Sequence, residues 1–99
     1  MHWVELDKRR PAVVISPDRR NASANDVIVI PVSTSARRMR WHVQLRRGEG
    51  GVSQDSSVRC ESVITVHQQF VEPEALGILS EARMREIEVA LLSALGIDD

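Results

Sequence analysis

The chain has 99 residues, a length that fits one domain with a modest hydrophobic core. Hydrophobic residues make up 42% and charged residues 27%, which is ordinary for a soluble globular protein, and no apolar run is long enough to cross a bilayer. The single cysteine, Cys60, excludes an intrachain disulfide and suits a reducing compartment. We therefore expect one domain over residues 1–99, located in the cytoplasm and without a membrane partner.

The formal net charge of −1 hides an asymmetry along the chain. Residues 1–60 carry eleven Lys/Arg against six Asp/Glu, whereas residues 61–99 carry two against eight, and Lys8 is the only lysine. The planar guanidinium of arginine suits bidentate contacts with phosphate, so a basic body predicts a polyanionic ligand. An equally weighted alternative is a high-GC genome that favours arginine codons.

Short strands are predicted along most of the chain. Alternating or β-branched stretches predict them over residues 3–6, 12–15, 27–32, 41–45, 57–60, 62–66 and 76–79. Residues 7–8 form a tight connection and residues 17–25 a turn-rich segment. Residues 48–51 are expected to be a loop, which lacks the strand-to-helix context of a phosphate-binding glycine motif.

The C-terminal segment predicts one amphipathic helix. Ser80 suits the N-cap and Gly96 the C-cap, and apolar residues recur at helical spacing at Met84, Ile87 and Leu91. Short strands followed by one closing helix favour a mainly-β fold, a small bent sheet or open barrel with the helix packed against it. In a dimer, Leu92 and Leu95 would be candidates for the interface.

The stretch KRRPAVVIS, residues 8–16, sets three cations before a buried strand. Pro11 can begin a strand but lacks the amide hydrogen needed at its centre, so Arg10 is held by a stiff backbone. One interpretation is a solvated charge cluster that protects a strand edge from aggregation. The other is an anion site.

These segments, taken together, resemble one family. RRPAVVIS, VIVIPVSTS, HVQL and GEGGVSQDSSVRCESVITV, followed by a terminal helix that ends in ALG, look like the MazF/PemK-type toxins of bacterial toxin–antitoxin systems. The resemblance implies a homodimeric, SH3-like small β-barrel with a C-terminal helix. It also implies a metal-independent endoribonuclease, without a cofactor, that cuts single-stranded RNA at a short sequence. A MazE-like antitoxin would neutralise it, and contact with DNA would be indirect, through that antitoxin.

The resemblance also implies a set of site residues. The arginine before the proline of the R-P element is Arg10, which would face the phosphate. Ser33 occupies the place of the family's Thr or Ser just after the strand that contains VIVIPV. The Arg-Cys-Glu element supplies Arg59 and Glu61. The expected substrate-binding residues are Arg9, Thr34, Arg37, Trp41 and His42. The chain departs from the family in its first hairpin loop, which shrinks to Asp7-Lys8.

The chemistry of RNA cleavage gives these residues alternative roles. The 2′-OH of RNA can attack the adjacent phosphorus if a base takes its proton and cations neutralise the phosphorane. Glu61 is either that base or an ion-pair partner that orients an arginine; Ser33 either donates to phosphate or ends its strand with a turn hydrogen bond. Trp41 is more simply a core residue than a base-stacking one, and His42 could contact a base.

Other chemistries and functions remain as alternatives. The three histidines and Cys60 are far apart in sequence, so no metal site is expected, and a two-histidine mechanism is disfavoured. A CcdB-like inhibitor of DNA gyrase would share the fold. However, such toxins end in Trp-Gly-Ile, and this chain has no tryptophan after Trp41. A non-catalytic SH3-like module would bind RNA or protein without turnover.

Overall fold

The computed structural model describes residues 1–34 and 38–97. Within these ranges the strands are β1 (His2–Glu5), β2 (Arg9–Val14), β3 (Asp26–Ser33), β4 (His42–Leu45), β5 (Ser56–Arg59), β6 (Ile64–His67) and β7 (Val71–Ala75). The helices are the single turn α1 (Asp18–Asn21) and α2 (Glu81–Ala94), together with the short 3₁₀ helices η1 (Glu49–Gly51), η2 (Cys60–Ser62) and η3 (Gln68–Phe70). The predicted mainly-β fold with a C-terminal helix is confirmed. The barrel and the homodimer stay predictions.

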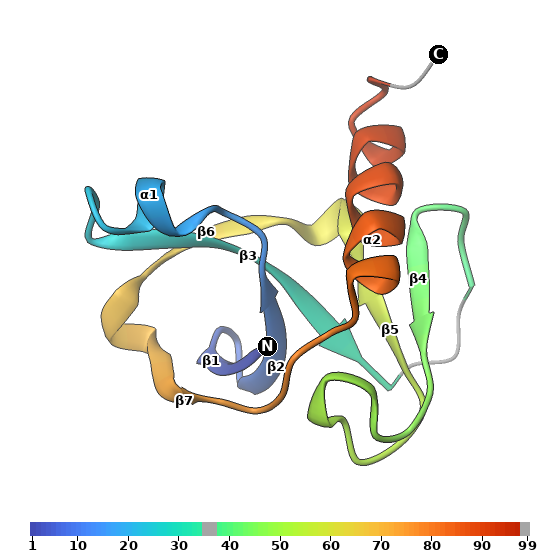
Figure 1. Ribbon diagram of the computed structural model, residues 1–99, viewed down its shortest axis with the longest axis horizontal. Helices are drawn as coiled ribbons and strands as arrows, with labels where there is room; N and C mark the ends of the chain where they lie inside the picture. Colours follow the sequence, from blue (N-terminus) through green and yellow to red (C-terminus); the bar gives the residue numbers. More distant parts are fainter. Residues whose placement is uncertain (35–37, 98–99) are drawn as a thin grey trace.

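The sheet is antiparallel and is organised around β3. Its order is β4-β5-β3-β2-β1-β7, and β6 also pairs with β3. One edge of β3 pairs first with β6, at residues 26–29, and then with β5, at residues 32–33. Figure 1 shows β3 running from the neighbourhood of α1 towards β5 and α2. This long strand therefore connects the two ends of the molecule.

Two apolar clusters lie on either side of this connection. The larger one packs α2 against the β3–β5–β4 end of the sheet, with Ile30, Val58 and Ile87 fully buried. The smaller one fills the other end, around Val4 and Val29. Apolar burial of this kind is the main favourable term in folding, so the two clusters hold the strands that carry the polar residues described below.

Helix α2 matches its prediction closely. The Ser80 hydroxyl accepts a hydrogen bond from the backbone N–H of Arg83 at 3.1 Å, and Gly96 ends the helix with φ of 74°. Ile87 is buried, and Met84 and Leu91 pack partly buried against the core. In contrast, Leu92 and Leu95 are 44% and 56% exposed. None of the helices in the described parts of the chain is long and apolar enough to cross a membrane.

The last strand was predicted in the wrong place. Residues 76–79 form no strand, and β7 lies earlier, at Val71–Ala75, paired with β1. The sequence of β7, VEPEA, carries few strand-forming residues, and its proline is tolerated because β7 lies at the edge of the sheet. Leu79 is buried for a different reason, since it joins the larger apolar cluster from an irregular segment.

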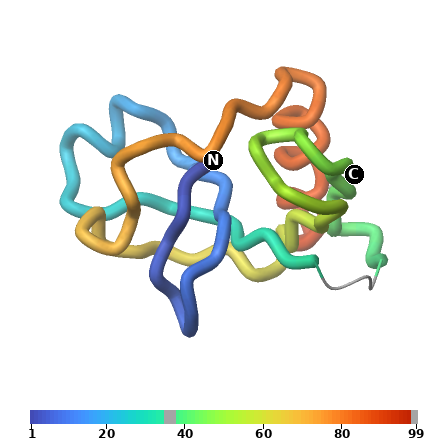
Figure 2. Tube along the Cα trace, turned by 90° about the horizontal axis from the view of Figure 1, so that it is seen from below, coloured from blue at the N-terminus to red at the C-terminus, as the bar shows by residue number. Residues whose placement is uncertain are grey.

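The first hairpin is short, as expected. β1 and β2 are joined by residues 6–8, and Val4 lies opposite Arg10 in the ladder. Figure 2 shows this hairpin projecting from the body of the molecule. Consequently, residues of the connection can contact the start of β2 but cannot cover the distant end of the sheet.

Candidate functional site

A cavity of about 530 Å³ lies where β4, β5 and the C-terminal part of α2 meet. Its lining includes four of the predicted site residues and three residues that the sequence did not single out. The former are Trp41, His42, Arg59 and Glu61, and the latter are Met39, Ser57 and Ala94. The structure thus gathers residues from separate segments around one space.

Strand register explains how these residues meet. His42 lies opposite Arg59 and Gln44 opposite Ser57 in the β4–β5 ladder, while Ser33 lies opposite Ser57 in the β3–β5 ladder. Directly paired residues share a face of the sheet, and so do residues two apart on one strand. The polar residues of these ladders therefore share one face. Val32, Val43 and Val58 occupy the opposite face and are buried in the core.

Glu61 and His42 form a close pair at this cavity. Nε2 of His42 lies 2.8 and 3.0 Å from the two carboxylate oxygens of Glu61. The His42 side chain is 3% exposed and that of Glu61 is 33% exposed. Burial acts to raise the pKa of Glu61, but the hydrogen bond from His42 and the charges of His42 and Arg59 outweigh it, so this pKa is lowered from its ordinary value.

Arg59 completes the charged group. Its guanidinium Nη2 lies 3.9 Å from a carboxylate oxygen of Glu61, a loose ion pair, and its side chain is 44% exposed. An exposed pair at this distance contributes little to stability. Arg59 therefore presents a cation beside the Glu61 carboxylate without being committed to it.

Arg10 does not line this cavity. Ala12 of β2 pairs with Pro31 of β3. Arg10 lies two residues before Ala12, and Ser33 lies two residues after Pro31. Its guanidinium makes a bidentate ion pair with Asp7 at 2.9 and 3.1 Å. This pair lowers the pKa of Asp7 to about 2.

The other predicted substrate-binding residues lie in different settings. Arg9 is bound to Glu72 at 2.6 and 2.9 Å and stacks over Trp3, with its guanidinium carbon 4.2 Å from the ring centre. Thr34 is exposed directly after β3. Arg37 lies outside the described residues. Trp41 is partly buried, and its carbonyl accepts a hydrogen bond from the Cys60 N–H at 3.3 Å.

Sequence reasoning missed three features of this region. Ser57 is buried but lines the cavity, and it donates a hydrogen bond to Gln44 at 3.0 Å. The pairing of His42 with Glu61 depends on the β4–β5 register, for which no local pattern exists. The pairing of Asp7 with Arg10 could have been predicted from the sequence, because an acid three residues before an arginine, across a tight hairpin, can reach it.

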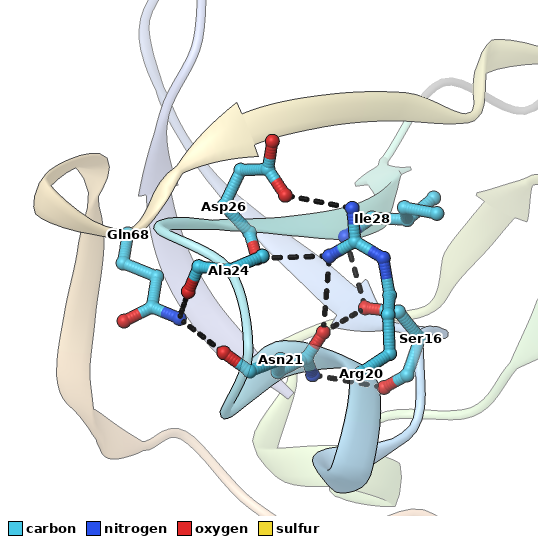
Figure 3. A network of polar contacts seen from close by, with 7 residues as sticks. All are labelled: Ser16, Arg20, Asn21, Ala24, Asp26, Ile28 and Gln68. Carbon is cyan, nitrogen blue, oxygen red and sulfur yellow. Dashed lines mark hydrogen bonds and ion pairs between the residues drawn. The ribbon is translucent and has the colours of Figure 1, made fainter.

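A second polar cluster lies at the opposite end of β3 (Figure 3). Arg20 binds the side chain of Asp26 at 2.7 Å and its carbonyl at 2.9 Å, and Asn21 both accepts from and donates to Ser16. Gln68 donates to the carbonyls of residues 21 and 24. These hydrogen bonds tie α1 to β3 and to the segment after β6.

Metal ligation finds no support in the side-chain arrangement. Across residues 1–34 and 38–97, no three His, Cys, Asp or Glu side chains gather as metal ligands would.

Burial, and then the nearby charge of Glu61, raises the pKa of the Cys60 thiol to about 11, so this cysteine is an inert core residue at neutral pH.

Comparison with known proteins identifies the class. The family described as PemK-like, MazF-like toxin of type II toxin–antitoxin system matches residues 4–95. The chain therefore belongs to this family.

Individual relatives agree with this assignment. The endoribonuclease MazF of Staphylococcus epidermidis is 28% identical over 92 residues, covering 91% of this chain and 76% of the relative. The toxin MazF-mt6 of Mycobacterium tuberculosis superposes with a TM-score of 0.90 at 23% identity, covering 99% and 97% of the two chains. A structure of MazE–MazF from Deinococcus radiodurans matches at 28% identity and a TM-score of 0.78, covering 96% and 92%.

Proposed function

We propose that this chain is a sequence-specific, metal-independent endoribonuclease that cleaves single-stranded RNA by attack of the 2′-OH. The observation that carries the proposal is the placement of the Glu61 carboxylate and the Arg59 guanidinium beside one cavity. The reaction needs a base for the 2′-OH and a cation for the phosphorane at one site. Family membership and the name of the Staphylococcus relative support the same activity.

In this mechanism Glu61 takes the 2′-OH proton. A glutamate is ionised at neutral pH and its pKa is here lowered further, so the carboxylate is in the form that accepts a proton. The new P–O2′ bond forms as the P–O5′ bond breaks, which leaves a 2′,3′-cyclic phosphate, and solvent water protonates the departing O5′ to give a 5′-OH. Arg59 stabilises the negative charge that develops on the phosphorane.

Arg10 on β2 and Ser33 on β3 serve the phosphate from the two strands that follow β5 in the sheet. Arg10 exchanges its ion pair with Asp7 for the RNA phosphate, which offers the same bidentate geometry. The Ser33 hydroxyl donates to a phosphate oxygen. Arg9, Thr34, Arg37, Trp41 and His42 belong to the surroundings that bind or organise the RNA.

The partners follow from family membership and from one surface. The Deinococcus MazF is paired with MazE, and we expect a MazE-like antitoxin here, with DNA contacted only through it. Leu92, Leu95 and Val89 leave an exposed apolar strip on α2, which suits a homodimer. A lone cysteine in the thiol form suits the cytoplasm, where the substrate RNA is found.

The test is to incubate the purified protein with a long single-stranded RNA in EDTA and to map the new 5′ ends. We expect discrete cuts at one short motif. Arg10→Ala should reduce the cleavage rate by about 10²–10³, the usual effect of removing one donor to a developing anion. Intact RNA after incubation with folded protein would contradict the proposal and would favour a binding module without turnover.

A further inference from the structure

The side chains of His42 and Glu61 differ in how far they are exposed to solvent. The imidazole is almost completely covered, at 3% exposure, whereas the carboxylate is 33% exposed beside the cavity. A group that contacts substrate must be reachable, so Glu61 is the member that meets the RNA. His42 stands behind it, and little of its ring is available to stack on a base.

The direction of the hydrogen bond follows from the charge of the carboxylate. An ionised carboxylate only accepts hydrogen bonds. Since the pKa of Glu61 lies below its ordinary value, it has no proton to donate at neutral pH. The Nε2 atom of His42 must therefore carry a hydrogen and donate it to the two Glu61 oxygens.

The backbones on both sides of this hydrogen bond are fixed. His42 is paired with Arg59 in the β4–β5 ladder, and its N–H donates to the Met39 carbonyl at 3.0 Å. The residue before Glu61, Cys60, is buried and donates to the Trp41 carbonyl at 3.3 Å. The His42–Glu61 bond thus joins two rigid segments, which limits how far the carboxylate can rotate.

We propose that His42 is a positioning residue, which holds the Glu61 carboxylate turned towards the cavity for the 2′-OH of RNA. This inference rests on the proposed function. Without His42, the carboxylate would be free to rotate onto Arg59, its other charged neighbour in the cavity. A lowered pKa makes Glu61 a weaker base, so His42 helps the reaction by geometry.

The test compares two substitutions at one position with a matched control. His42→Leu removes the donor, whereas His42→Gln keeps an N–H close to the position of Nε2. Gln44→Leu is the control, because it removes another side-chain hydrogen bond between β4 and β5, the one to Ser57. Thermal unfolding of each variant shows whether it is folded.

Single-turnover cleavage is then measured against pH. We expect His42→Leu to lose about 10-fold or more in rate, a part of what a positioned base contributes, with RNA affinity nearly unchanged. His42→Gln should recover most of the rate, and Gln44→Leu should match the wild type. Within residues 1–34 and 38–97, the groups that face Glu61 are His42 from β4, Arg59 from β5 and the adjacent Cys60. Losing the His42 hydrogen bond raises the Glu61 pKa, so the acid limb of His42→Leu should move to higher pH.

A second readout does not depend on activity. Carbon-13 NMR of the Glu61 carboxyl should show a higher titration midpoint in His42→Leu than in wild type and His42→Gln. An unchanged midpoint, or equal rates for His42→Leu and Gln44→Leu, would overturn the inference. Wild-type protein that never cleaves RNA would instead overturn the proposed function, and the NMR comparison would still decide the role of His42.

Discussion

The cluster around Arg20 and the cluster around Glu61 both pair a guanidinium with a carboxylate, at opposite ends of β3. In the first, Arg20 and Asp26 are 2.7 Å apart, and further hydrogen bonds join them to Asn21, Ser16 and the Asp26 carbonyl. In the second, Arg59 and Glu61 are 3.9 Å apart beside a cavity. Their exposures are similar, so exposure does not distinguish them.

The difference lies in how many of the hydrogen-bonding groups find partners within the chain. In the Arg20 cluster, the hydrogen-bond donors find acceptors within residues 16–26, as in a structural network. The Glu61 cluster holds its carboxylate from one side, through His42, and leaves the other side towards the cavity. We infer that the first cluster stabilises the fold and that the second performs chemistry.

Among the variants that test this comparison of the two clusters, Arg59→Ala should change activity most. Arg59→Ala should lower the cleavage rate by about 10²–10³, because it removes the cation beside Glu61. The melting temperature should change little, since a loose, exposed pair contributes little to stability. Cleavage kinetics and thermal unfolding of one preparation check both. A variant that melts much earlier but cleaves normally when folded would reverse the assignment of the two clusters.

The intermediate effect is on stability, at Asn21. Asn21→Ala leaves the buried Ser16 without the side chain that accepts from its hydroxyl, and should cost about 1–3 kcal/mol of unfolding free energy. Urea unfolding measures this cost. The cleavage rate of the folded fraction should equal that of wild type, because α1 lies far along β3 from the cavity. A large loss of rate at full folding would show that the Arg20 cluster belongs to the site.

The fold was largely predictable from the sequence because its signals are local. The β-branched run of β3 and the capped, periodic segment of α2 each specify their own structure. The last strand was not predictable in this way, since VEPEA pairs with β1 only because that edge is available. The structure shows that Arg9, Arg10 and Arg20 are engaged in ion pairs. Sequence gives a local signal only for the pair of Arg10 with Asp7, three residues before it.

The sequence predicted a set of candidate site residues, whose roles stay predictions, but not how they are arranged. Arg59, Glu61, Trp41 and His42 do meet at one cavity, whereas Arg10 lies elsewhere, held by Asp7. The contact of His42 with Glu61 spans 19 residues and depends on strand register. No propensity encodes such a contact, and only the folded sheet determines it.

The smallest expected effect concerns the pH dependence of the Arg10–Asp7 pair. The folded-state pKa of Asp7 is lowered to about 2, mainly by the hydrogen bond from Arg10, against an ordinary value of 3.8. The pair therefore stabilises the fold above about pH 4 and loses this contribution as the pH falls towards 2. Carbon-13 NMR of Asp7 should give a midpoint below 3, which Arg10→Ala returns to near 3.8. Equal midpoints would show that the pair does not form in solution.

If Glu61 acts as the base for the RNA 2′-OH, the products of cleavage must carry the marks of this reaction. We would cleave an RNA oligonucleotide in EDTA and determine the masses of both fragments, with Glu61→Gln in parallel. The account predicts a 2′,3′-cyclic phosphate on one fragment and a 5′-OH on the other, and a rate for Glu61→Gln lower by about 10²–10⁴. A 5′-phosphate product, or a Glu61→Gln variant that cleaves at the wild-type rate, would contradict it.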